Sequence, residues 1–150
     1  GQLPLIGRPD PRPHPCRTMQ EAEEVLGARL LLPAYFPDAL AWPPRLLTAG
    51  RRPAPWVSME VPRRDGTGGL IIAQAIGAEP PAPRPAGRVV RRAGVAVGDG
   101  TARLEVRAGT AELRWQRGAR RLLLAGPEAP ETLVRIATAM RPRVVTEAAR

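Results

Sequence analysis

The chain lacks most of the side chains on which enzymatic catalysis and metal binding depend. Its 150 residues contain one histidine, one serine and one cysteine. His14 would have to act as the base for Ser58, yet it stands in a proline-rich segment, which is a poor place to hold a base beside a nucleophile. One thiol, Cys16, and one imidazole cannot supply the usual zinc ligand sets, and no internal disulfide can form. We therefore expect a protein that is not an enzyme and has no metal ion and no cofactor.

Carboxylates and glycines are not arranged for catalysis either. The four aspartates are scattered, so they do not form a calcium loop. The glycine-rich stretch 65–69 lacks the Lys-Ser/Thr pair of a phosphate loop, which predicts a hairpin loop instead. Glu105 and Glu112 could form a carboxylate pair, but such residues on an open strand face are usually solvated.

Long apolar runs are missing as well. None approaches the roughly 20 residues that cross a bilayer, and the N-terminus lacks the pattern of a signal peptide. Because the sequence starts at Gly1, our hypothesis keeps a membrane tether upstream of that residue.

Lysine and asparagine are absent, so all 23 basic residues are arginines, and with 14 acidic residues they give a net charge of +9. Arginine binds carboxylates and phosphates through a planar fork, which favours acidic partners. An all-arginine, alanine- and proline-rich composition is equally typical of a GC-rich genome, and both explanations stay open. Three Trp, one Tyr and one Phe offer few stacking platforms, so we expect no specific nucleic-acid binding.

The chain contains 19 prolines, which divide it into short elements, above all in its N-terminal half. Residues 1–17 read as an extended proline-rich arm, ahead of a single domain over 18–141 and a tail over 142–150. Thr18 and Glu21 form a capping-box pattern and Gly27 follows the last apolar position, which predicts a helix over 18–27. The proline-broken segment through residue 44 predicts a buried connection, and a turn region follows it.

Aromatic residues cluster within this connection. Tyr35, Phe36 and Trp42 are framed by prolines. They either form a lid over one edge of the core or line a groove that receives a peptide or lipid. The second alternative makes Tyr35 and Trp42 candidate partner-binding residues.

Strand patterns follow the connection. Residues 56–61 and 70–76 predict a β-hairpin, and the proline-rich residues 79–87 predict an excursion at the surface. Runs over 88–97, 101–107, 110–116 and 120–125, separated by glycine turns, predict a β-meander. Pro130 opens a helix whose apolar face repeats at helical spacing through Met140. The fold class is therefore α+β: an antiparallel meander sheet of about six to seven strands with a short N-terminal helix and a C-terminal helix packed on one face.

The register of the meander follows from its turns, because a one-residue slip would send every apolar side chain to the wrong face. A turn at residues 108–109 pairs Val106 with Ala111, Leu104 with Leu113 and Ala102 with Trp115. A turn at residues 117–118 pairs Leu113 with Leu122 and Ala111 with Leu124. Both hairpins then place their apolar side chains on one inward face.

The outward face of this meander carries a row of arginines. Arg103, Arg114 and Arg121 align on three neighbouring strands, with Glu105 opposite Glu112. Like charges that face each other are unfavourable, and diagonal contacts of Arg103 with Glu112 and of Arg114 with Glu105 would offset this. The row is either a solvated face or a site that an anionic ligand, a peptide carboxylate or an acidic partner neutralises. The three arginines are our candidate partner-binding residues.

The order of these segments is similar to a known pattern. The phrase Leu30-Leu31-Leu32-Pro33-Ala34-Tyr35-Phe36-Pro37, the strand Leu113-Arg114-Trp115-Gln116 and the closing stretch Glu131–Ala137 resemble a bacterial family of unknown function. Its members occur in the extracytoplasmic parts of anti-sigma-factor-like proteins and lipoproteins. The resemblance spans residues 18–141, and the insertion at 79–87 departs from it. It implies an extracytoplasmic domain of the cell envelope without catalytic residues.

The sequence thus leads to one hypothesis and two alternatives. We expect a non-catalytic, envelope-exposed sensing or interaction domain that binds a protein, a peptide or an anionic envelope component. The first alternative is a purely structural spacer module. The second is a non-specific nucleic-acid-binding domain, which the net charge of +9 keeps open.

Overall fold

A computed structural model describes residues 12–145 of the chain. Within that range the elements follow one another as β1 (His14–Pro15), α1 (Met19–Leu26), β2 (Leu31–Pro33), β3 (Arg45–Gly50), β4 (Trp56–Pro62), β5 (Gly69–Ile76), β6 (Arg91–Val97), β7 (Gly100–Arg107), β8 (Thr110–Arg117), β9 (Arg120–Gly126), α2 (Pro130–Thr138) and β10 (Met140–Pro142). Neither helix in residues 12–145 is long and apolar enough to span a membrane. Residues 1–11 of the predicted arm lie outside the described range.

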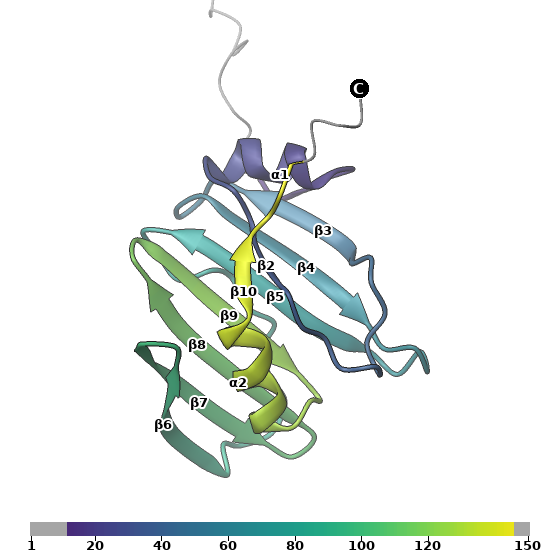
Figure 1. Cartoon of the computed structure of the whole chain (residues 1–150), viewed down its shortest axis with the longest axis vertical. Helices are drawn as coiled ribbons and strands as arrows, with labels where there is room; N and C mark the ends of the chain where they lie inside the picture. The colour runs from purple at the N-terminus through teal and green to yellow at the C-terminus, as the bar shows by residue number, and fades with distance from the viewer. Residues whose placement is uncertain (1–11, 146–150) are drawn as a thin grey trace, which may run out of the picture.

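One large antiparallel sheet organises these elements. Its eight strands lie in the order β1-β3-β4-β5-β9-β8-β7-β6, so that β1 and β6 form the two edges. The short strands β2 and β10 pair with each other in a separate ribbon, and this β2–β10 ribbon lies with α2 over one face of the sheet (Figure 1). The α+β class with a helix at each end is confirmed, and the sheet has slightly more strands than expected.

Local sequence signals account for α1. The Thr18 side chain accepts a hydrogen bond from the Glu21 N–H at 3.1 Å, and Gly27 ends the helix with φ 77°. That left-handed conformation is open to glycine at no steric cost, which is why the helix stops there. The Glu21 carboxylate accepts from the Arg17 N–H instead of completing the predicted capping box on Thr18.

Four strands escaped the sequence analysis because each depends on a distant partner, and one of them, β2, stands where a buried connection was expected. β1 pairs with β3, with His14 opposite Ala49, so the end of the predicted arm is held against the sheet. β3 stands where a turn region was expected. β10 begins at Met140, which was assigned to the C-terminal helix, and pairs with β2. None of these short strands has an apolar pattern that would reveal it locally.

The register of the second meander hairpin differs from the prediction by two residues. Leu113 lies opposite Leu124, not Leu122, and Ala111 lies opposite Gly126. The cause is the turn, which consists of Gly118 and Ala119. Gly118 has φ 63° and takes the first loop position, where such a two-residue turn requires a left-handed residue. A shift of two residues keeps every side chain on its predicted face. The first hairpin has the predicted pairs Val106 with Ala111 and Leu104 with Leu113.

The main core lies between the inward face of the sheet and the elements that cover it. Large, fully buried side chains come from the sheet, from α2 and from the segment before β2, among them Ile72, Leu104, Leu113, Leu122, Leu124, Leu133, Ile136 and Leu30. Trp115 is only partly buried at the margin of this core. Burial of these side chains is the main stabilising term of the fold.

A buried glutamine joins the β2–β10 ribbon to the sheet. Gln74 of β5 is fully buried on the inward face. Its amide oxygen accepts from the Leu31 N–H at 2.9 Å, and its amide nitrogen donates to the Leu31 carbonyl at 3.1 Å. Arg120 donates to the same amide oxygen at 2.7 Å and to the Arg29 carbonyl at 2.6 Å. The ribbon therefore has backbone partners on both sides: Leu31 bonds to the Gln74 side chain, and the neighbouring Leu30 carbonyl accepts from the Arg143 N–H at 2.7 Å.

A buried carboxylate joins α1 to the end of the ribbon. Glu23 accepts from the Leu30 N–H at 2.8 Å and from two guanidinium nitrogens of Arg143 at 3.0 and 2.5 Å, and it pairs with Arg29 at 3.2 Å. Burial raises the pKa of Glu23, but the hydrogen bonds from Arg143 and Leu30 and the two positive charges outweigh it, so the pKa lies below its usual value. The carboxylate is ionised at neutral pH.

The outward face of the sheet is only partly solvated, because the proline-rich segment covers its middle. Pro80 is buried, and so are the outward residues Ala73, Ala75 and Leu123. Pro81 and Pro83 line a hollow of about 320 Å³ together with Leu46, Trp56 and Ile71. The predicted surface excursion is therefore in part a cover for a second, smaller apolar cluster.

We predict that Gln74→Ala lowers the free energy of unfolding by about 2–4 kcal/mol, because it leaves the buried Leu31 N–H and carbonyl without partners. Urea denaturation measures the loss. Gln20→Ala, at an exposed position of α1, is the matched control and should change the value by no more than about 0.5 kcal/mol. Equal effects of the two variants would show that the Gln74 contacts do not hold the ribbon.

A second prediction concerns pH. Because the folded pKa of Glu23 lies below its unfolded value of 4.5, its contribution to stability is complete above that value and is lost as pH falls through the folded pKa. Glu23→Gln should therefore be less stable than the wild type by about 1–3 kcal/mol at neutral pH, and the difference should shrink near pH 3. Urea unfolding at the two pH values measures both, and a constant difference would contradict the assignment.

Candidate functional site

A shallow depression on the outward face contains the predicted arginine row. It has a volume of about 350 Å³ and is lined by side chains of β7, β8, β9 and the proline-rich segment and by the edge strand β6, among them Arg103, Arg114, Arg121, Gln116, Glu79 and Gly94. This arginine depression lies on the side of the sheet opposite α2 and the β2–β10 ribbon, the side turned away from the viewer in Figure 1. The structure thus brings together the three predicted arginines.

Two of the three arginines already share a carboxylate. Glu79, which follows β5 at the start of the proline-rich segment, lies 3.4 Å from Arg114 and 3.2 Å from Arg121. Its side chain remains 43% exposed. The sequence analysis missed Glu79 because it stands about 35 residues before its partners in a segment without regular structure. Two of the three predicted arginines are therefore paired with a carboxylate that the prediction did not include.

Arg103 is the third arginine of the depression and is exposed. Among residues 12–145, no ion pair or hydrogen bond holds its guanidinium. Its positive charge interacts with the negative charge of Glu105 on the same strand. Glu105 is itself engaged by Arg92 at 3.0 Å. The hydrogen bond from Arg92, followed by the charges of Arg92, Arg107 and Arg103, keeps the pKa of Glu105 below its usual value despite partial burial. Positive charge therefore dominates at the Arg103 end.

The expected diagonal contacts are replaced by others. Arg114 donates to Glu112, two residues earlier on its own strand, at 2.6 Å. Arg107 lies 3.9 Å from both Glu105 and Glu112 and relieves the repulsion between these facing carboxylates. The Glu112 side chain is itself buried. Arg114 therefore has a structural duty towards Glu112 as well as a place in the depression.

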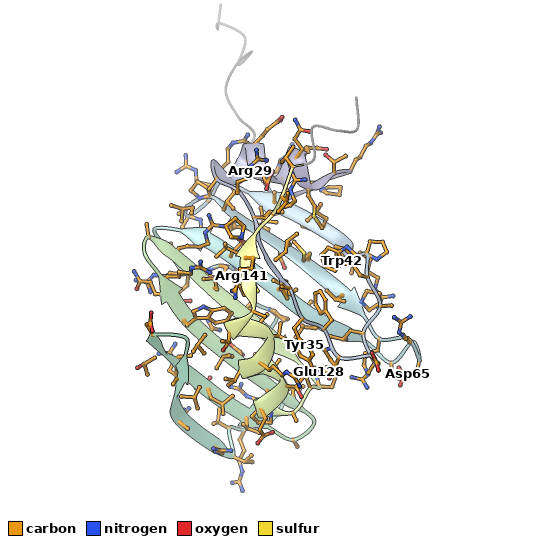
Figure 2. All side chains as sticks on the ribbon, viewed as in Figure 1. Arg29, Tyr35, Trp42, Asp65, Glu128 and Arg141 are labelled. Atoms are coloured by element: carbon orange, nitrogen blue, oxygen red, sulfur yellow. The ribbon has the colours of Figure 1, made fainter. Side chains whose placement is uncertain are left out.

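The aromatic candidates lie elsewhere. The guanidinium of Arg135 in α2 sits 4.2 Å from the centre of the Tyr35 ring, and Tyr35 packs against the core. Trp42 stacks at 5.3 Å with Phe36 and is 44% exposed. Figure 2 shows Tyr35 near α2 and Trp42 further along the connection, beside β3 and β4. Tyr35 and Phe36 pack against the core, as a lid would, whereas Trp42 does not, and the structure does not bring Tyr35 and Trp42 to the arginines.

The single histidine and the single serine lie apart. His14 pairs with Ala49, and Ala49 pairs with Val57, so His14 shares the inward face of Val57 while Ser58 faces outward. His14 instead has Cys16 and Glu21 as neighbours, and the donor atoms of these three side chains lie within 4.8 Å of one another. Burial, followed by the charge of Glu21, raises the pKa of the Cys16 thiol.

The groups that line the arginine depression can bind an anion. Its guanidinium groups donate charge-assisted hydrogen bonds in a planar fork that fits a carboxylate. Thr101 and Gln116 add neutral hydrogen-bonding groups to the wall. Comparisons of the chain with protein families, curated proteins and solved structures find no match.

Proposed function

We propose that this chain is a non-catalytic interaction domain that binds an acidic, extended segment of a partner protein in the arginine depression. The observation that carries the proposal is the pair of contacts that Glu79 makes with Arg114 and Arg121. Glu79 belongs to a proline-rich segment without regular structure, so it is an internal example of a peptide carboxylate in this depression. A carboxylate of a partner can take the same place.

The position of the depression supports an extended partner. It reaches β6 through Ala93 and Gly94, and β6 is an edge strand that pairs only with β7 within the described sheet. Edge strands offer unpaired backbone groups, to which an extended peptide can add as a further strand. Arg91 and Arg92 stand exposed at the start of β6 and extend the positive surface along that edge.

The proposed location is the cell envelope, outside the cytoplasm. Its support is the resemblance of residues 18–141 to domains of anti-sigma-factor-like proteins and lipoproteins. An interaction domain of that kind needs a recognition surface but no catalytic residues. Fusing a reporter enzyme that is active only outside the cytoplasm to the full natural coding sequence tests the location.

A third prediction is that Arg103→Glu with Arg121→Glu weakens binding of a fluorescein-labelled peptide of alternating glutamate and glycine by about tenfold or more. Arg114 is kept because it neutralises the buried Glu112. Fluorescence anisotropy measures the affinity, and a glutamine–glycine peptide checks that charge is required. Arg52→Glu with Arg84→Glu is the matched control, since it changes the net charge equally at exposed positions outside the depression.

Unchanged affinity of the first double variant, or an equal loss in the control, would refute the site. Stronger binding of mixed-sequence DNA than of the acidic peptide, with a steep fall in affinity as salt rises, would favour the nucleic-acid alternative. Preference for anionic lipid vesicles over the peptide would favour an envelope component as the partner. The absence of binding to all three probes would favour a structural spacer.

A separate prediction uses the internal carboxylate. Glu79→Gln removes the charge that occupies Arg114 and Arg121, so the acidic peptide no longer has to displace it. Affinity should rise about threefold or more in the same anisotropy titration. Glu24→Gln, at an exposed position of α1, should leave it unchanged. An equal or lower affinity of Glu79→Gln would show that Glu79 does not compete with the peptide.

A further inference from the structure

We propose that His14, Cys16 and Glu21 form a binding site for a zinc-type divalent cation where the chain passes from β1 into α1. The three side chains offer an imidazole nitrogen, a thiol sulfur and a carboxylate oxygen, and these donor atoms lie within 4.8 Å of one another. All three side chains are partly exposed, so a cation from solvent can reach them. This site is independent of the proposed function.

The donor atoms are close to the spacing that the metal requires. Zinc binds nitrogen, oxygen and sulfur at about 2.0–2.3 Å in tetrahedral geometry, which places neighbouring ligand atoms about 3.3–3.8 Å apart. The donor atoms now lie within 4.8 Å of one another. Small side-chain rotations that move these atoms by about 1 Å bring them to the spacing of zinc ligands.

The backbone around the three residues is held by contacts that do not use their donor atoms. β1 pairs His14 with Ala49, and the Cys16 N–H donates to the Leu47 carbonyl at 2.8 Å. Thr18 caps α1 and thereby sets the first turn, on which Glu21 stands. The ligands therefore come from a strand edge, a short connection and a capped helix whose relative positions are set before any metal binds.

The chemistry of the donor set selects the class of metal. A thiolate and an imidazole favour zinc and related transition metals, whereas calcium and magnesium prefer ligand sets made of oxygen. On binding, the Cys16 thiol gives its proton to water, and a thiolate with the Glu21 carboxylate balances the two charges of the cation. Oε2 of Glu21 accepts from the Arg17 N–H at 3.1 Å, which leaves Oε1 to bind the metal. Three protein ligands leave one tetrahedral position for water or for an external ligand.

The sequence analysis set this possibility aside because it counted only one histidine and one cysteine. Glu21, the third ligand, was assigned to the capping box of the first helix and was therefore not considered as a metal ligand. In the structure Glu21 bonds to the Arg17 N–H and lies beside Cys16, whose thiol it influences. The site lies near edge strand β1, whereas the arginine depression reaches the opposite edge strand β6.

Cobalt titration of the metal-free full chain, with a phosphine as reductant, tests the proposal. The wild type should show the near-ultraviolet charge-transfer absorption of a cobalt–thiolate bond, and zinc should abolish it by displacement. Glu21→Gln and His14→Ala should each weaken cobalt binding by about tenfold or more, since even residues that only support metal ligands change affinity by about 10–100-fold. Cys16→Ser should remove the absorption, and zinc should raise the melting temperature of the wild type but not of Cys16→Ser.

Glu24→Gln is the matched control, because Glu24 is an exposed glutamate of the same helix. It should bind cobalt with wild-type affinity. Circular dichroism of each variant without metal establishes that it folds; Glu21→Gln keeps an amide that can accept the Arg17 N–H. The proposal is overturned if the wild type gives no thiolate absorption, or if Glu21→Gln and His14→Ala bind cobalt as tightly as the wild type.

Discussion

The two hydrogen bonds between the Gln74 side chain and the Leu31 backbone are the contacts on which this architecture depends. A sheet with an apolar face must be covered, and here the cover includes a β2–β10 ribbon whose outer backbone groups would otherwise be buried without partners. A glutamine amide presents an N–H donor and a carbonyl acceptor side by side, as the backbone of a strand residue does. Gln74 therefore lets a two-stranded ribbon rest on the sheet at the cost of one polar residue in the core.

Polar contacts complete the attachment at the ends of the ribbon. Glu23 accepts hydrogen bonds from the guanidinium of Arg143 and from the N–H of Leu30, while Arg117 donates to the Met140 carbonyl at 3.1 Å. Such groups are costly to bury unless every one is paired, and no buried side-chain nitrogen or oxygen in the described part of the chain lacks a partner. Arginine suits this duty because its fork serves several acceptors at once. Part of the high arginine content therefore has a structural role: these arginines attach the β2–β10 ribbon that covers the inward face of the sheet.

The outward face of the sheet, opposite α2 and the β2–β10 ribbon, uses arginine differently. The proline-rich segment occupies the middle of that face with apolar residues and brings Glu79 to the arginines at its margin. A ligand of the arginine depression must therefore compete with a weak internal partner. Competition of this kind lowers affinity but raises selectivity for segments with several carboxylates. The depression and the metal site reach opposite edges of the sheet, so each can be altered without the other.

Local sequence determined the elements and the side-chain faces. Thr18 and Gly27 delimit α1 because caps act within one turn, and alternation placed Leu104, Leu113 and Trp115 on one face because strand side chains repeat every two residues. Those same alternations put the three arginines on one face, but the turn at Gly118 set the register, so that Arg121 lies opposite Gln116 and not opposite Arg114. Contacts between distant segments decided the rest: β1, β3 and β10 have no local pattern, and Glu79 reaches the arginines only because the proline-rich segment folds back across the sheet. The grouping of His14, Cys16 and Glu21 likewise needed β3 to hold β1, since pairing energy comes from a partner strand that the local sequence does not contain.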